Sequence, residues 1–489
     1  MANSGLRVAG TAPTGASTAT IICGLALTSV TLPADHVVDV FTVAAVGVGL
    51  SLSLATGIEA GVSVRNLFRV DILMLGVLYA LTFLEFLFPQ PDLDGLVSVA
   101  AATRGTNAVL LGFGGIVVGR HLVPRQYRFG RISTLVDVRP SSIFWLFVIA
   151  TLLGYAHIFL AVNFDPFEAL RQMSLPRFWQ PWGRGKYGDA YSLLYELGLL
   201  IYLLPPIAGL IYARSKDYNV LKKLAVTTVL IFTFYYGFSS GTRSMFATYV
   251  ITFTGAYLLN MPKITLWRAL YHGAPILILL LLGTAYMLEF RETGLSNFSF
   301  SESEIDSLYV DYNVVIVSRL TDVFPDSYAF LGFEIPYSAL IRPIPRVLWP
   351  GKPEGLSVTI ESAAGAPGGV TTSCTFIGEA YMAGGLLAVL FTGLLFGAAA
   401  EMWNRVGREI NSHFAQLLYV SGFFCAVVAM RSMLSMVPPM LPTLALWLYG
   451  KLWPPVLLGA ARLPRSVGSG RERALGCASA FFRRVFANT

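Results

Sequence analysis

Apolar runs separated by short polar segments repeat along almost the whole chain. Each run approaches the roughly 20 residues that a helix needs to cross about 30 Å of hydrocarbon. A transmembrane barrel would instead show segments of about ten residues in which apolar and polar positions alternate. The pattern therefore predicts an all-α fold, a polytopic bundle of transmembrane helices.

About twelve runs meet this description, and we place the bundle with its loops at residues 17–460. The expected spans are 17–32, 38–56, 71–88, 101–118, 143–162, 191–213, 224–238, 245–259, 274–288, 384–403, 414–430 and 438–458. A polar lead, 1–16, precedes the bundle, and a basic tail, 461–489, follows it. Two long polar segments interrupt the series at 163–190 and 289–382, and we expect the second to be a large, partly structured loop.

Composition supports a membrane location, and the absence of several motifs argues against a metal or another cofactor. Hydrophobic residues make up 55% of the chain and charged residues only 13%, whereas soluble proteins carry about 25% charged residues. The net charge of +7 requires no nucleic acid partner, because basic residues gather in the cytoplasmic loops of membrane proteins. The sequence contains no metal-ligand cluster, P-loop, HExxH or GxSxG motif, so we expect no metal and no other cofactor.

The distribution of basic residues predicts the orientation. The densest group between two expected spans is Arg120, Arg125, Arg128, Arg131 and Arg139, and the tail is also rich in arginine. The positive-inside rule places both groups, and hence both termini, in the cytoplasm. Both long polar segments then lie on the outer face.

Twelve basic residues remain on the outer side, where this rule disfavours them. They are Arg104, Arg171, Arg177, Arg184, Lys186, Arg243, Arg291, Arg319, Arg342, Arg346, Lys352 and Arg431. Arg243 lies in a tight turn and Arg431 at the end of an apolar run, where a solvated loop explains an arginine poorly. One hypothesis is a basic pocket that grips a phosphate or diphosphate through guanidinium groups. The alternative is that each cation reaches water or pairs with a structural carboxylate.

The segment IRPIPRVLWPGKP, residues 341–353, adds candidates within the second long polar segment. Its four prolines predict a stiff, extended backbone. Such a backbone would present Arg342, Arg346 and Lys352 together with the ring of Trp349. A rigid cap over the bundle is the other interpretation.

Glu379 and Tyr381 lie in TFIGEAYMAGG, where the second long segment is expected to rejoin the bundle. A carboxylate beside arginines at a membrane edge is a candidate general base or hydroxyl-binding group. It could equally orient a pocket arginine or lie in solvent. Asp311, Asp322 and Asp326 are further candidates for binding hydroxyls. The aromatic rings of the outer segments fit either an interfacial belt or stacking on sugars.

Three motifs resemble the Wzy-type O-antigen and exopolysaccharide repeat-unit polymerases of bacteria: GTRSMF at 241–246, PRVLWPGKP at 345–353 and GEAYMAGG at 378–385. The resemblance implies a metal-independent glycosyltransferase of the bacterial inner membrane. Such an enzyme polymerises undecaprenyl diphosphate-linked oligosaccharides on the periplasmic side, transferring the growing chain to an incoming unit. It works among membrane lipids, and a chain-length regulator and a flippase of the same pathway are candidate partners.

The resemblance also implies residue roles. By matched position, the diphosphate ligands would be Arg243, Arg342, Arg346 and Lys352. Arg243 and Arg346 would stabilise charge on the departing diphosphate, while Glu379 would activate the acceptor hydroxyl. The substrate-binding set is completed by Arg431, Trp349 and Tyr381.

Other functions compete with this hypothesis. A transporter or flippase of a lipid-linked or anionic saccharide would concentrate charges near the membrane midplane, whereas the expected spans carry few, chiefly Glu85 and Glu196. A ligase-like transferase would be expected to show a usable outer histidine, but His36 lies in a short turn and His157 inside a span. A noncatalytic partner in an envelope complex is a third alternative.

Overall fold

The computed structural model describes residues 10–90, 93–124, 138–182, 194–261, 264–295, 311–346, 348–353, 355–365, 373–410 and 412–452. Within these ranges the fold is all-α, as predicted, with sixteen α-helices and short 3-10 turns. Several residues considered above lie outside these ranges. They are Arg125, Arg128, Arg131, Arg184, Lys186 and the whole tail 461–489.

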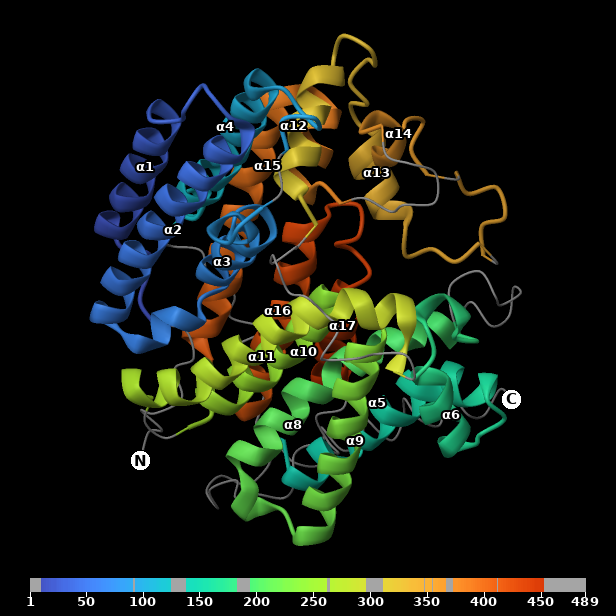
Figure 1. Cartoon of the computed structure of the whole chain (residues 1–489). Helices are drawn as coiled ribbons and strands as arrows, with labels where there is room; N and C mark the ends of the chain where they lie inside the picture. Colours follow the sequence, from blue (N-terminus) through green and yellow to red (C-terminus); the bar gives the residue numbers. More distant parts are fainter. Residues whose placement is uncertain are drawn as a thin grey trace, which may run out of the picture.

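The helices follow one another with short connections over most of the chain (Figure 1). They are α1 (Gly15–Val30), α2 (Val37–Val62), α3 (Val70–Thr82), α4 (Val99–Gly119), α5 (Pro140–Ala161), α6 (Pro166–Met173), α8 (Leu204–Ala213), α9 (Val220–Ser239), α10 (Arg243–Leu259), α11 (Leu266–Thr293), α12 (Asn313–Val323), α13 (Glu334–Ile341), α14 (Ile360–Ala363), α15 (Thr375–Glu409), α16 (His413–Arg431) and α17 (Met440–Leu452).

The protein is a multi-pass membrane protein by helix length and hydropathy. Seven helices in the described part of the chain are long and apolar enough to cross a membrane: α2, α4, α5, Leu194–Ala213, α9, α15 and α16. The other expected spans coincide with α1, α3, α10, α11 and α17. Each of the twelve apolar runs is therefore at least partly helical, while seven of the helices meet the full criterion of length and composition.

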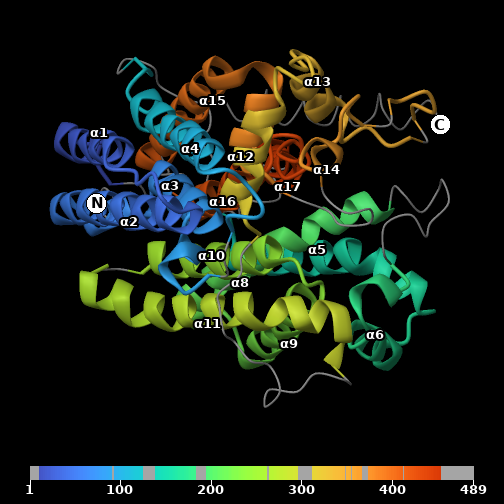
Figure 2. The ribbon, with the colours of Figure 1, turned by 45° about the horizontal axis from the view of Figure 1, so that its top comes forward.

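The helices form two layers (Figure 2). Helices α1–α4, α12 and α15 lie in one layer, and α5, α8, α9 and α11 lie in the other. Contacts between α10 and α16 join the layers, because α10 also packs on α8 while α16 also packs on α3 and α15.

Helices α4 and α15 approach each other most closely, because both carry glycines at matching positions. Gly115 and Gly119 on α4 face Gly393 and Gly397 on α15, and a Cβ on Gly397 would lie 2.1 Å from the Ile116 carbonyl oxygen. Paired small residues four positions apart are typical of tightly packed membrane helices.

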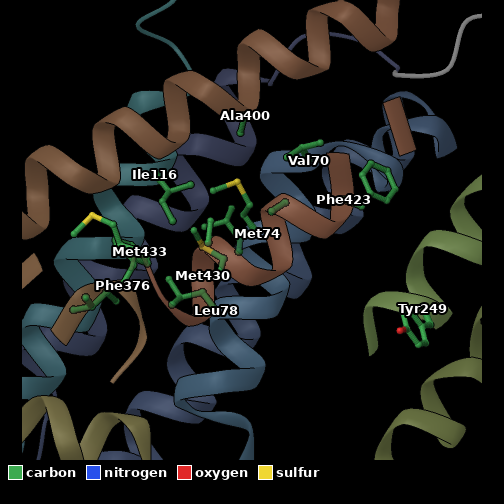
Figure 3. Packing of buried hydrophobic residues seen from close by; sticks show 14 of the residues in the cluster. Val70, Met74, Leu78, Ile116, Tyr249, Phe376, Ala400, Phe423, Met430 and Met433 are labelled. Atoms are coloured by element: carbon green, nitrogen blue, oxygen red, sulfur yellow. The ribbon is translucent and has the colours of Figure 1, made fainter. Parts of the chain in front are cut away.

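A continuous apolar cluster extends through both layers, and residues of α3 belong to it. Val70, Met74 and Leu78 recur every four residues and therefore share one face of the helix. Figure 3 shows this face directed toward Met430 of α16 and Ile116 of α4. The helical spacing of these apolar residues places them on the buried side of α3.

Polar contacts mark the two ends of the bundle. At one end, where α3 begins and α4 and α15 end, Asp71 accepts hydrogen bonds from Arg69 Nη2 (2.6 Å), Arg120 Nη1 (3.0 Å) and Asn404 Nδ2 (2.7 Å). At the other, where α16 ends and α10 begins, Arg431 Nη1 donates to Ser244 Oγ (2.9 Å). We call these the Arg69 end and the Arg431 end.

The second long polar segment is partly structured, as expected. Helix α12 lies inside it and packs on α4, with Val314, Val317 and Leu320 buried. Helices α13 and α14 follow. Helix α15 begins at Thr375 and bends at Gly384 and Gly385, where Gly385 has φ 64°. The helix thus starts nine residues before the expected span, so Glu379 and Tyr381 lie on it.

Candidate functional site: an arginine cluster

Four arginines from four separate segments converge at the Arg431 end. They are Arg177 in the 3-10 turn η3 (Arg177–Trp179), Arg243 as the first residue of α10, Arg291 in the last turn of α11 and Arg431 as the last residue of α16. Arg177 interacts electrostatically with Arg291 and Arg431. Asp311 interacts electrostatically with Arg243, Arg291 and Arg431. All four arginine side chains are half-buried. We call this group the arginine cluster.

Two glycines permit the close approaches that build the cluster. Gly241, with φ 60°, lies in the turn before Arg243, and a Cβ there would lie 2.5 Å from Cβ of Arg291. Gly294, with φ 72°, ends α11, and a Cβ there would lie 2.7 Å from the Ser174 carbonyl oxygen. Only glycine readily combines a positive φ with such contacts. These turns therefore bring Arg243 to Arg291, and Arg291 to the segment that carries Arg177.

Local contacts hold the guanidinium groups in place. Arg431 donates to Ser244, the neighbour of Arg243 along α10, and Arg291 lies 5.3 Å from the centre of the Phe178 ring. Burial, followed by the charges of Arg291 and Arg431, lowers the pKa of the Arg177 guanidinium. An arginine nevertheless stays protonated in a protein, so the cluster concentrates positive charge in a partly dry environment.

Asp311 is the carboxylate that the structure adds to this group. Its backbone N–H donates to Glu85 Oε2 (3.3 Å), which fixes the chain just before α12. Burial raises the pKa of the Asp311 carboxyl, while Arg431, Arg243 and Arg291 act in the opposite direction. A carboxyl group with these neighbours can accept a proton or bind a hydroxyl group at the edge of the cluster.

Glu379 is buried, with 2% of its surface exposed. It accepts hydrogen bonds from Ser432 Oγ (2.6 Å), the Met433 N–H and the Leu434 N–H (3.0 Å). These donors directly follow Arg431 in the chain. The alternative of a solvated edge is therefore wrong, while the orientation of a pocket arginine by Glu379 stays a prediction. Whether Glu379 also acts as a base stays a prediction.

The proline-rich segment is folded into turns, so the expectation of an extended backbone is wrong. The N–H groups of Ile344, Leu348 and Lys352 donate to carbonyls three residues earlier. Proline fixes φ near the value that a turn requires, and it therefore fits this geometry as well as an extended one.

Cations of this segment bind its own backbone. Lys352 Nζ donates to the carbonyls of Arg342 (3.0 Å) and Ile344 (2.9 Å), and Arg346 Nη1 donates to the Lys352 carbonyl (3.1 Å). Burial, then the charges of Arg346 and Arg342, lowers the pKa of Lys352. We call Arg342, Arg346 and Lys352 the loop cations. Trp349 lies half-buried in the same turns, and Arg342 interacts electrostatically with Glu379.

Two of the disfavoured outer cations pair with carboxylates, which supports the alternative interpretation for them, and a third binds backbone carbonyls. Arg104 pairs with Asp322, and Arg171 pairs with Glu168 at 3.4 Å. Arg319 donates to the carbonyls of Leu96 (3.2 Å) and Ala364 (2.8 Å) and so ties α12 to its surroundings.

The structure thus regroups the predicted site. Arg243 and Arg431 lie together, the loop cations form a second group, and Glu379 contacts the chain beside Arg431 while interacting with Arg342. Tyr381 instead lines a groove with Arg104. Arg177 and Arg291 were noted only among the twelve disfavoured outer cations and Asp311 only as a hydroxyl-binding candidate, and the sequence placed none of the three in the predicted site. The glycines at 241 and 294, each next to a helix end, are the signal that could have found Arg291.

No protein-family model matches the chain, and neither a curated protein nor a solved structure matches it. Among the described residues, no three His, Cys, Asp or Glu side chains come together as a metal site. The functional argument therefore rests on the chemistry of the arginine cluster and its neighbours.

Proposed function

We propose that this protein polymerises undecaprenyl diphosphate-linked oligosaccharide repeat units on the periplasmic side of the bacterial inner membrane. The growing chain would be transferred from its lipid carrier to an incoming unit. The observation that carries the proposal is the convergence of Arg177, Arg243, Arg291 and Arg431 at one end of a membrane-embedded bundle. The resemblance to the polymerase family supports the same function, and one of the matching motifs contains Arg243.

The cluster suits a diphosphate because guanidinium groups bind phosphate oxygens in pairs. Mutual repulsion among half-buried cations is relieved when a multivalent anion binds between them. Glycosyl transfer releases the lipid diphosphate, and fixed positive charges would stabilise the negative charge that develops on it. An anion bound here would therefore be bound most tightly at the moment of bond cleavage.

Two carboxylates, Asp311 and Glu379, lie near the arginine cluster and have different surroundings. Asp311 lies at the edge of the cluster, and its raised pKa suits a group that takes the acceptor proton. Glu379 already accepts three hydrogen bonds from residues 432–434, which suits a positioning role for Arg431. The loop cations would contribute to diphosphate binding. One of them, Arg342, interacts electrostatically with Glu379.

Twelve spans with cytoplasmic termini form part of the proposal. The twelve helical runs can alternate in direction, and this arrangement agrees with Arg69 and Arg120 meeting at one end while Arg243 and Arg431 meet at the other. The Arg431 end would then face the periplasm, where lipid-linked units are available.

The test uses the purified full-length protein in nanodiscs with lipid diphosphate-linked repeat units, and product length is followed on gels. We expect Arg431→Ala and Arg243→Ala to lower the polymerisation rate about 100-fold or more. Arg171→Ala, which removes an exposed arginine paired with Glu168, is the control and should polymerise normally. Full-length polymer from both cluster variants, or none from the wild type, would refute the proposal.

A flux assay separates the proposal from transport. Vesicles that contain the protein are given a labelled lipid-linked unit on one side, and its appearance on the other side is measured. We expect no protein-dependent transfer. Movement of the unit across the membrane without polymerisation would favour the flippase alternative. If the cluster variants lose both this movement and polymerisation, one anion site serves both activities.

A further inference from the structure

We propose that a lateral groove between α1, α4, α12 and α15 binds one zwitterionic phospholipid of the surrounding membrane. The groove has a volume of about 490 Å³, within the range of about 300–1,000 Å³ typical of small-molecule sites. Most of its lining is apolar, with Leu25, Leu110, Leu111 and Leu386 among the lining residues, and Arg104 and Tyr381 supply polar groups.

Polar and apolar groups are arranged along the groove as they are along a lipid. Arg104 lies in the second turn of α4, near the helix end at Val99, whereas Leu110 and Leu111 lie further inside. On α1, Ser29 lies next to the end at Val30 and Leu25 lies one turn deeper. At about 1.5 Å per residue, Leu110 is about 9 Å deeper than Arg104. A lipid would therefore place its headgroup at Arg104 and an acyl chain beside the leucines.

The bend in α15 shapes one wall of the groove. Tyr381 precedes the bend at Gly384 and Gly385, Leu386 follows it, and both side chains line the groove. A Cβ on Gly385 would lie 3.1 Å from Cζ of Phe330, so a glycine with positive φ allows this close packing. Glu379 faces residues 432–434 from the same helix, and since it lies two positions before Tyr381, the two side chains leave nearly opposite sides of α15.

The charges at the polar end select the headgroup. Arg104 pairs with Asp322, and their side chains remain 52% and 41% exposed. Tyr381 interacts electrostatically with Arg104, Asp322 and Asp326. One cation beside two carboxylates complements a phosphate joined to an ammonium group. A headgroup with only negative charge would meet Asp322 and Asp326, so the groove differs from the arginine cluster in its expected ligand.

The experiment measures lipid binding without turnover, so it is independent of the proposed polymerase activity. Native mass spectrometry of the full-length protein in detergent follows titrations with phosphatidylethanolamine, phosphatidylglycerol and undecaprenyl diphosphate. We expect one tightly bound phosphatidylethanolamine per chain. Leu386→Trp, which fills the groove, should weaken its binding at least tenfold. Leu387→Trp is the matched control, because Leu387 is the next residue, is 81% exposed and does not line the groove.

Headgroup variants test the charge argument. The double variant Asp322→Asn with Asp326→Asn should shift the preference toward phosphatidylglycerol at least tenfold, with Glu168→Gln as the control for a neutralised exposed carboxylate. Three results would overturn the proposal. They are stronger binding of phosphatidylglycerol by the wild type, equal losses from the two tryptophan variants, and displacement of phosphatidylethanolamine by undecaprenyl diphosphate. The last result would make the groove part of the diphosphate site.

Discussion

The two ends of the bundle both hold arginines, but they use them differently. At the Arg69 end, Arg69 bonds to Asp71 through Nε and Nη2 (3.0 and 2.6 Å), and its Nη1 bonds to Glu59 (3.0 Å). Arg120 shares Asp71, and Asn404 donates to the same carboxylate. The charged side chains of this network are almost completely inaccessible to solvent.

At the Arg431 end, the cluster arginines are half-buried, and Arg177 interacts electrostatically with Arg291 and Arg431. Asp311 is the carboxylate that interacts with three of them. A buried charge must be compensated within the protein, whereas a half-buried cation remains accessible to a ligand. The comparison indicates that the Arg69 end holds the helices together, and it is consistent with the proposal that the Arg431 end binds an anion.

The largest expected effect concerns the Arg69 end. Arg69→Met leaves Glu59 and Asp71 buried with less compensating charge. Breaking a buried pair costs about 3–5 kcal/mol, so we expect a marked fall in thermal stability, measured by unfolding of the purified protein. Arg214→Met, which breaks a pair with Asp217 whose side chains are 20% and 39% exposed, is the control and should lower stability much less. An unchanged stability of Arg69→Met would contradict a structural role for this network.

Anion binding should stabilise the protein only through the Arg431 end. Inorganic diphosphate at about 100 times its dissociation constant adds about 2.7 kcal/mol to a folded state that binds it. We expect this gain for the wild type and for Arg171→Ala, but a much smaller gain for Arg431→Ala. Thermal shift titrations measure it, and an equal shift for all three proteins would place the anion elsewhere.

Glu379 is an exception to the comparison, because it is a buried and hydrogen-bonded carboxylate at the Arg431 end. Glu379→Ala removes the acceptor for three donors and should cost about 1–3 kcal/mol. Glu379→Gln keeps one acceptor oxygen and should retain part of both stability and polymerisation. If Glu379→Gln folds normally and polymerises nothing at any pH, Glu379 acts as the base rather than as a positioning residue.

The same substitution used at Arg69 should have little effect in the arginine cluster. Arg291→Met removes a cation that interacts unfavourably with Arg177. We expect thermal stability without ligand to stay within about 1 kcal/mol of the wild type, or to rise. A loss as large as that of Arg69→Met would mean that the two ends do not differ as proposed.

The smallest expected effect is a pH dependence from Asp311. Its pKa is raised above the ordinary value of 3.8, so the folded protein binds more protons than the unfolded chain just above that pH. Stability should therefore fall as pH rises through this window and stay level above it. Asp311→Asn should lack this component, which unfolding midpoints measured from pH 4 to pH 7 would show. Parallel curves for both proteins would argue against the raised pKa.

The apolar runs alone were enough to predict the class of the protein and much of its secondary structure. Apolar length and the exclusion of unpaired backbone groups from hydrocarbon make each long apolar run helical wherever the chain folds in a membrane. The same reasoning marked Arg243 and Arg431 as unusual, because the position of an arginine relative to an apolar run is a local property. Helix α12 was not predicted as a helix, since its burial comes from packing against α4 and its eleven residues include Arg319 and Asp322.

The packing of the helices specifies which cations lie close together, and the sequence does not show it. Ser244 and Arg431 are 187 positions apart, yet they share a hydrogen bond, and nothing local to either one specifies the other. In the sequence, Arg69 and Arg120 look like ordinary basic residues of loops. In the fold, both pair with Asp71. Charge interactions depend on distance and on burial, and both are set by how the helices pack.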